Sequence, residues 1–115
     1  MNTFKKEVSF EERLYQSSSI MEKYSNRLPV IIQKDNKLNT PDIDKNKYLV
    51  PNELKVSQLI FTIRHRIKLD KNQAIFLFND NTILKSSDSI SYIYDTYKDE
   101  DGFLYINYSL ENTFG

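Results

Sequence analysis

Apolar residues recur at helical spacing in three stretches of the chain. Residues 10–24 predict one helix, with Ser9 opening an S-x-x-E capping pattern and apolar positions at Phe10, Leu14, Met21 and Tyr24. Residues 56–67 predict a second, because their apolar positions fall on one face of a 3.6-residue repeat. Residues 90–97 follow a Ser/Asp-rich start that can cap a third helix. A short helical turn is also predicted at about residues 4–8.

Four further stretches have the composition of strands. Residues 29–33 and 48–50 are short and rich in β-branched or aromatic side chains, residues 74–78 are apolar, and residues 103–108 are rich in aromatic residues. Pro51 ends the second of these strands, and proline cannot donate to a ladder, so this strand is expected at a sheet edge. Polar segments with turn chemistry separate the strands, among them residues 34–46, 79–81 and 101–102.

The order of these elements predicts the fold class. One long helix packed across a four-strand mixed sheet gives an α+β, ubiquitin-like β-grasp, to which two N-terminal helices are added. We expect a helical extension over residues 1–25 packed on the core, a β-grasp over residues 26–110 and a tail over residues 111–115. The length of 115 residues fits one domain with one modest core.

Composition excludes several classes of chemistry. The chain has no cysteine, hence no disulfide, thiol nucleophile or thiolate metal site. No apolar run approaches the ~20 residues that span a bilayer. His65 has no second histidine or cysteine to complete a zinc site, and no catalytic constellation or phosphate-binding loop stands out. The sequence therefore predicts a protein that is not an enzyme and binds no cofactor, metal or nucleic acid.

The formal net charge is zero, but the charge is divided unevenly along the chain. Residues 1–68 carry 13 Lys/Arg against 8 Asp/Glu, whereas residues 69–115 carry 3 against 8. The basic part could receive acidic partners, and a well-solvated surface would explain the same pattern.

Five motifs in order along the chain carry a resemblance to a known family. They are Asn26-Arg27-x-Pro29-Val30, Pro41-x-Ile43-Asp44, Lys45-x-Lys47-Tyr48-Leu49-Val50-Pro51, Asp101-Gly102-Phe103-Leu104-Tyr105 and Glu111-Asn112-Thr113-Phe114-Gly115. From Phe4 to Gly115 the chain resembles the autophagy ubiquitin-like modifiers, which include GABA-receptor-associated protein and microtubule-associated protein light chain 3. A shared fold alone would not give function, but here the functional residues themselves match.

The resemblance implies that the protein is a group transferred by enzymes. An activating enzyme adenylates the C-terminal glycine, Gly115, and takes it as a thioester; a conjugating enzyme then passes it to the amino group of phosphatidylethanolamine. A cysteine protease of the same system removes the lipid. Glycine suits this chemistry, since without a Cβ its backbone can approach a catalytic cysteine closely. The protein would be cytoplasmic when free and on autophagosome and related vesicle membranes when lipidated.

The resemblance also implies a peptide-binding surface along residues 47–50. A free edge strand can accept an extended peptide, and side-chain alternation gives it one pocket on each side. The expected ligand has the form aromatic-x-x-aliphatic with acidic flanks. The aromatic pocket is assigned to Gln16, Ile20, Pro29, Ile31, Lys47, Leu49 and Phe103. The aliphatic pocket is assigned to Tyr48, Val50, Pro51, Leu54, Leu59, Thr62 and Ile63.

Two further sets of residues are expected to take part in binding. Lys45, Lys47 and Arg66 would contact the acidic flanks of the peptide. Ile75, Phe76, Leu77 and Phe78 could form a second docking or protease-contact site, although at least one face of this strand is expected to be core. Four positions depart from the residues usual in the family. Gln16 bears on the selection of the aromatic residue, Leu59 and Thr62 bear on the shape of the aliphatic pocket, and Leu110 bears on the stiffness of the tail.

Two alternatives to a lipid-conjugated autophagy modifier stay open from the sequence. The protein could be a ubiquitin-like adaptor that binds peptide motifs and is never conjugated. It could also modify the membrane of a plastid-derived organelle, as the family does in some lineages.

Overall fold

The computed structural model describes residues 3–36, 40–70 and 72–110. In chain order the elements are α1 (Thr3–Glu7), α2 (Phe10–Lys23), β1 (Arg27–Lys34), β2 (Lys47–Pro51), α3 (Val56–Arg66), β3 (Ile75–Asn79), β4 (Thr82–Ile83), α4 (Ile90–Tyr97) and β5 (Leu104–Leu110). Every predicted helix and strand is present at nearly its predicted bounds. The predicted tail over residues 111–115 lies outside the described residues.

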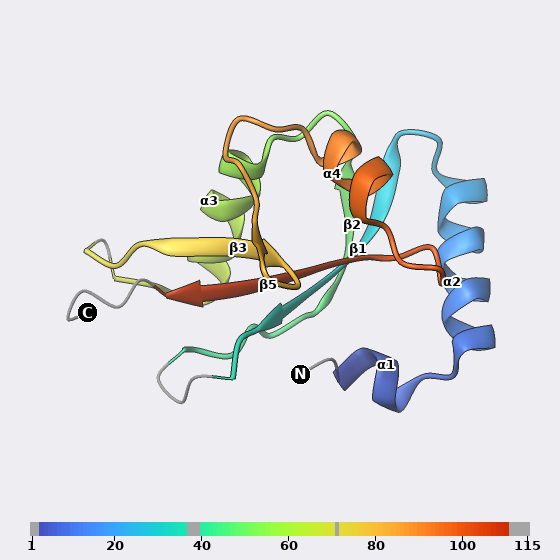
Figure 1. The fold of residues 1–115 in the computed structure, drawn as a ribbon, viewed down its shortest axis with the longest axis horizontal. Helices are drawn as coiled ribbons and strands as arrows, with labels where there is room; N and C mark the ends of the chain where they lie inside the picture. The colour runs from blue at the N-terminus through green and yellow to red at the C-terminus, as the bar shows by residue number, and fades with distance from the viewer. Residues whose placement is uncertain (1–2, 37–39, 71, 111–115) are drawn as a thin grey trace.

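The strands form one mixed sheet in the order β2-β1-β5-β3-β4. The central strands β1 and β5 are parallel, and each pairs antiparallel with its outer neighbour. This arrangement confirms the predicted α+β, ubiquitin-like architecture (Figure 1). The sheet has five strands rather than the expected four, because a turn with Asp80 in the left-handed region pairs the two residues of β4 with Phe78 and Asn79. A two-residue strand has no periodicity from which to predict it.

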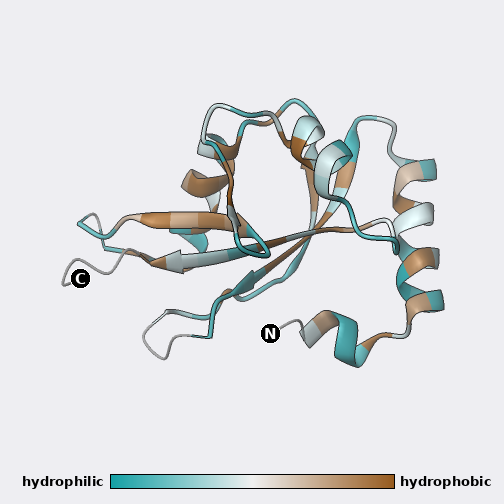
Figure 2. Cartoon of the chain, viewed as in Figure 1, coloured by the Kyte–Doolittle hydropathy of each residue, from teal (hydrophilic) through white to brown (hydrophobic). Residues whose placement is uncertain are grey.

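Helices cover both faces of the sheet and give the protein two apolar clusters, a large and a small one, where the length predicted a single core. The larger core lies under α3 and α4 and includes Val30, Ile32 and Ile106. The smaller core lies under α1 and α2, where Ile31 and Phe103 pack against Phe4. Residues 30–32 of β1 therefore alternate between the two cores and are all fully buried. Figure 2 shows apolar segments concentrated in the strands and on the helices that face them.

Helix α2 begins as predicted, because the Ser9 hydroxyl accepts a hydrogen bond from the Glu12 amide. However, its apolar stripe does not face the sheet. The residues of α2 that are buried are Arg13 and Ser17, while Phe10 and Leu14 each stay 41% exposed. Apart from Ile20, which packs on the small core, the helix is held on the sheet through polar contacts, which the hydrophobic pattern could not indicate.

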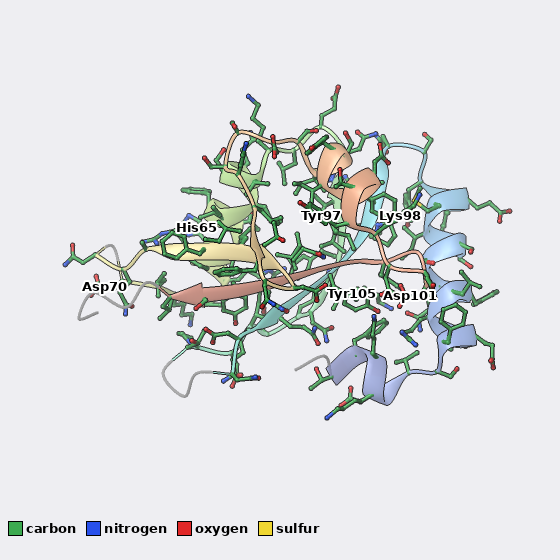
Figure 3. All side chains as sticks on the ribbon, viewed as in Figure 1. His65, Asp70, Tyr97, Lys98, Asp101 and Tyr105 are labelled. Atoms are coloured by element: carbon green, nitrogen blue, oxygen red, sulfur yellow. The ribbon has the colours of Figure 1, made fainter. Side chains whose placement is uncertain are left out.

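Those polar contacts converge on Asp101, which has no exposed surface. Its carboxylate accepts hydrogen bonds from Arg13 Nη1 at 2.9 Å, the Phe103 amide and the Tyr105 hydroxyl. Ser17 donates to the Asp101 carbonyl, which brings α2 close to the loop before β5 (Figure 3). Burial, followed by the neighbouring Asp101 carboxylate, raises the pKa of Tyr105 far above its ordinary value, so this phenol remains a donor at physiological pH.

The loop that carries Asp101 requires glycine at the next position. Gly102 has φ of +87°, and a Cβ built on it would lie 2.3 Å from the Ser17 hydroxyl oxygen.

The same loop also binds helix α1, because Lys5 of α1 pairs with Asp99. Partial burial alone would raise the pKa of Asp99, but hydrogen bonds from Lys5 and from the Asp101 amide outweigh it and lower the pKa. One loop thus anchors both N-terminal helices.

Candidate functional site

Strand β2 lies at an edge of the sheet, as predicted, and pairs with β1 alone among the described strands. The Ile32 amide donates to Asn46 and the Asn52 amide donates to Asn26, which fixes the ladder pattern at both ends of the strand. Because hydrogen-bonded pairs alternate with non-bonded pairs, Tyr48 and Val50 direct their backbone groups toward β1. Lys47 and Leu49 therefore direct their amides and carbonyls outward, where an added strand could pair with them.

One of these outward groups already has a partner. Arg27 Nη1 donates to the Leu49 carbonyl at 3.1 Å. Pro29 stands opposite Leu49 in a non-bonded pair, so its missing amide removes no bond from the β1–β2 ladder. An incoming strand would replace the Arg27 side chain at the Leu49 carbonyl with a backbone amide.

The predicted aromatic pocket lies on the α2 side of β2, and its residues come from α2, β1, β2 and the loop that precedes β5. Gln16 of α2 accepts a hydrogen bond from Lys47 Nζ at 2.9 Å, which joins the helix to the edge strand. Ile20 packs on the small core, next to Ile31 and Phe103. These last two side chains are 0% exposed, so they form a floor beneath the surface that Ile20, Lys47 and Leu49 present.

Phe4 is part of this floor and was not among the predicted site residues. Its ring meets that of Phe103 edge to face, with centroids 5.2 Å apart. The Gln33 side-chain carbonyl accepts hydrogen bonds from the amides of Thr3 and Phe4 and so holds the start of α1 beside the pocket. The only sequence signal for this role was the apolar position in the short helical turn predicted at residues 4–8.

The predicted aliphatic pocket lies on the α3 side of β2, and its residues also come together. Val50, Leu59 and Ile63 are buried in the large core. The accessible rim consists of Tyr48, Pro51, Leu54 and Thr62, which are exposed or partly exposed. The Thr62 hydroxyl donates to the Gln58 carbonyl within α3, so the methyl group remains to contact a ligand. As on the other side, a buried floor underlies an open rim.

The three cations predicted to bind acidic residues are divided between the two sides of β2. Lys47 lies on the α2 side, held by Gln16. Lys45 and Arg66 lie on the α3 side over the ring of Tyr48, with their cationic groups 5.3 and 5.5 Å from its centroid. The Tyr48 hydroxyl is buried and has no hydrogen-bond partner among the described residues. Its pKa is raised, mainly by desolvation; Arg66 lowers it and Asp44 raises it further.

Asp44 is a site residue that sequence reasoning placed in a motif without giving it a role. Its carboxylate pairs with Arg66 Nη1 at 3.1 Å. Both side chains stay partly exposed, at 65% for Asp44 and 37% for Arg66. The carboxylate therefore neutralises one of the three cations expected to meet an acidic ligand.

The possible second site on β3 is divided by side-chain alternation. Ile75 and Leu77 are buried in the large core, which removes them as direct contacts for a partner. Phe76 is 37% exposed and Phe78 is partly buried beside β4. The core role expected for at least one face of this strand is confirmed.

The end of β5 lies far from α2 along the longest dimension of the molecule (Figure 1). Gly115, the predicted conjugation site, lies outside the described residues. Within the described part of the chain, none of the helices is both long enough and apolar enough to cross a membrane.

The chain matches one protein family over most of its length, and curated proteins of the same name match it over nearly all of it. The family described as "Autophagy protein Atg8 ubiquitin like" matches residues 12–115. Autophagy-related protein 8e of Arabidopsis thaliana is 51% identical over 112 residues, covering 97% of this chain and 92% of that protein. Autophagy-related protein 8 of Kluyveromyces lactis is 49% identical over 114 residues, covering 99% of this chain and 92% of that protein.

Two solved structures extend the comparison to the fold. The crystal structure of Trypanosoma brucei ATG8 has a TM-score of 0.93 and 38% identity, covering 100% of this chain and 99% of that one. Plasmodium falciparum Atg8 in complex with a Plasmodium falciparum Atg3 peptide has a TM-score of 0.86 and 38% identity, covering 95% of this chain and 96% of that one.

Proposed function

The chain belongs to the Atg8 family of ubiquitin-like autophagy proteins, and we propose from this premise that it is a modifier joined through Gly115 to phosphatidylethanolamine. The observation that carries the proposal is the chain's match to the family through its final residue, in the sequence Glu-Asn-Thr-Phe-Gly. On this proposal the carboxylate of Gly115 is first converted to an acyl adenylate with release of pyrophosphate. A cysteine thiolate then displaces AMP, and the lipid amine displaces the thiolate to form an amide.

The partners follow from this sequence of reactions. They are an activating enzyme, a conjugating enzyme and a cysteine protease that hydrolyses the amide and releases the lipid. The Plasmodium relative, solved with an Atg3 peptide, supports a peptide-mediated contact with the conjugating enzyme. The free protein would be cytoplasmic and the lipidated protein would reside on autophagosome and related vesicle membranes.

The membrane-bound protein would recruit receptors through aromatic-x-x-aliphatic peptides. The support for this part is the open edge of β2, with outward backbone groups at Lys47 and Leu49 and an apolar surface on each side. Main-chain pairing would orient the peptide, and the two surfaces would select its anchors.

The intact mass of the protein extracted from cell membranes tests conjugation directly. We expect the mass of the chain plus one phosphatidylethanolamine, less one water. A chain of unmodified mass in every membrane fraction would support the unconjugated adaptor instead. An adduct found only on a plastid-derived organelle would support the organellar alternative.

Replacing Leu49 with alanine is expected to weaken peptide binding about thirtyfold. The substitution removes three carbons from the rim of the aromatic surface, at ~0.8 kcal/mol each, or about 2 kcal/mol of binding free energy. Isothermal titration with an acidic-x-Trp-x-x-Leu peptide measures the loss, against a wild-type affinity expected near micromolar. Ile83→Ala is the matched control, because Ile83 is an exposed aliphatic residue on β4, at the opposite edge. Unchanged binding by Leu49→Ala would place the ligand elsewhere, such as at Phe76.

Lys47→Ala is expected to cost less than Leu49→Ala, about threefold, since exposed charge pairs contribute ~0.2–1 kcal/mol. The effect should disappear in 1 M salt, where the Debye length falls to about 3 Å. Titrations at low and high salt measure both quantities. A loss that persists at high salt would show that the lysine acts through its alkyl chain or through Gln16.

A further inference from the structure

Three charged side chains gather around the ring of Tyr48 on the α3 side of β2. Lys45 and Arg66 stack over Tyr48, and the Asp44 carboxylate lies within hydrogen-bond distance of Arg66 through both of its oxygens, at 3.1 and 3.4 Å from Nη1. Asp44 is thus paired with Arg66, the cation that we expect to bind an acidic residue of the ligand.

We propose that Asp44 is a specificity-determining residue that masks Arg66 and so lowers the affinity for ligands with an acidic side chain on the α3 side of β2. The inference rests on the proposed peptide-binding function. An incoming carboxylate must displace Asp44 or share Arg66 with it, so the gain from the new ion pair is offset by loss of the old one. The pair is exposed enough for such an exchange.

The geometry of an added strand identifies the ligand position concerned. The aromatic anchor meets Lys47 and Leu49, and the aliphatic anchor meets Val50 and Pro51 further along the strand. A ligand with two residues between its anchors therefore runs in the same direction as β2, and its side chains alternate between the two sides. The residue directly after the aromatic one then faces the α3 side, near Tyr48. The residue two before the aromatic one faces the α2 side with Lys47.

The α2 side offers an internal comparison. There the cation, Lys47, is held by the side-chain amide of Gln16, a neutral group that in turn donates to Glu12 at 3.2 Å. An acidic ligand residue would compete with an amide for Lys47 but with a carboxylate for Arg66. Selection for acidic residues should therefore be stronger on the α2 side.

The test uses three peptides that share one Trp-x-x-Leu frame. The first has Glu directly after Trp, the second has Gln there, and the third has Glu two residues before Trp with Gln after it. Isothermal titration compares wild type with Asp44→Asn, which keeps the shape and removes the charge. Asp42→Asn is the matched control, since Asp42 lies in the same loop, 85% exposed and paired with Lys34 rather than Arg66.

We expect Asp44→Asn to bind the first peptide about threefold more tightly and the other two unchanged. Asp42→Asn should not distinguish the peptides, and adding Arg66→Gln to Asp44→Asn should remove the gain. An equal effect of Asp44→Asn on all three peptides, or weaker binding of the first, would overturn the masking role and leave Asp44 as a residue that orders the loop. If wild type binds none of the peptides, the proposed peptide-binding function itself fails.

Discussion

Replacing Asp101 with alanine is expected to destabilise the protein by about 3–5 kcal/mol, the cost of breaking a buried ion pair by removing one partner. The Arg13 side chain is only 11% exposed, so the substitution leaves its charge buried without a carboxylate. The Phe103 amide and the Tyr105 hydroxyl lose their acceptor at the same time. Small domains have a net stability of roughly 5–15 kcal/mol, so this is a large share of the total.

The free energy of unfolding in urea measures the effect. Asp95→Ala is the matched control, because Asp95 is exposed on α4 and its loss should change stability by less than about 0.5 kcal/mol. Hydrogen exchange should show the greatest loss of protection in α1 and α2, which the Asp99–Asp101 loop anchors. A loss below 1 kcal/mol, or exchange that rises first in α3, would contradict this role for Asp101.

The sequence predicted the parts of the fold that depend on apolar periodicity. Val56, Leu59 and Ile63 mark the buried face of α3, and all three are in the large core. The alternation along β2 correctly placed Lys47 and Leu49 on one side and Tyr48 and Val50 on the other. These predictions hold because the side-chain repeat of a helix or a strand is set by the local backbone, and it shows which residues share one face.

The parts that the sequence could not provide depend on polar pairs formed across the fold. Asp101 was placed in a turn and in a family motif, but nothing in its neighbourhood indicates Arg13 as a partner 88 positions away. Asp44 was likewise placed in a motif without its partner, Arg66, which lies at the end of α3. The exposed stripe of α2 shows the converse: apolar spacing predicted the helix but not the face that packs, on which Arg13 and Ser17 bind Asp101 and Ile20 meets the small core.

For the proposed site, the sequence predicted which residues lie together better than it predicted which of them are accessible. The residues of each pocket come together on the expected side of β2. However, Ile31 and Phe103 are fully buried, and so support the surface rather than form its exposed wall. Because helices cover both faces of the sheet, residues 28–33 of β1 are all buried whichever face they point to. The alternation along a strand does not reveal which layers lie above it.

The substitution Gly115→Ala is expected to abolish conjugation to phosphatidylethanolamine while leaving stability unchanged. Every covalent step of the proposed pathway takes place at the carbonyl of this residue, and a Cβ adds bulk where the catalytic cysteines must approach. The predicted core ends with β5 at Leu110, so the free energy of unfolding should match wild type. Peptide binding at β2 should also persist, because neither pocket includes the tail.

A reconstituted reaction with activating enzyme, conjugating enzyme, ATP and phosphatidylethanolamine liposomes measures the loss, with the lipid adduct detected by mass. Asp95→Ala serves again as the control, since it keeps Gly115 and changes only an exposed side chain of α4. Recording the enzyme thioesters in the same reaction locates the failing step: activation fails if neither thioester forms, and transfer fails if both accumulate. Lipidation of Gly115→Ala at the wild-type rate would remove Gly115 as the reacting residue, and retained peptide binding would then favour the adaptor role.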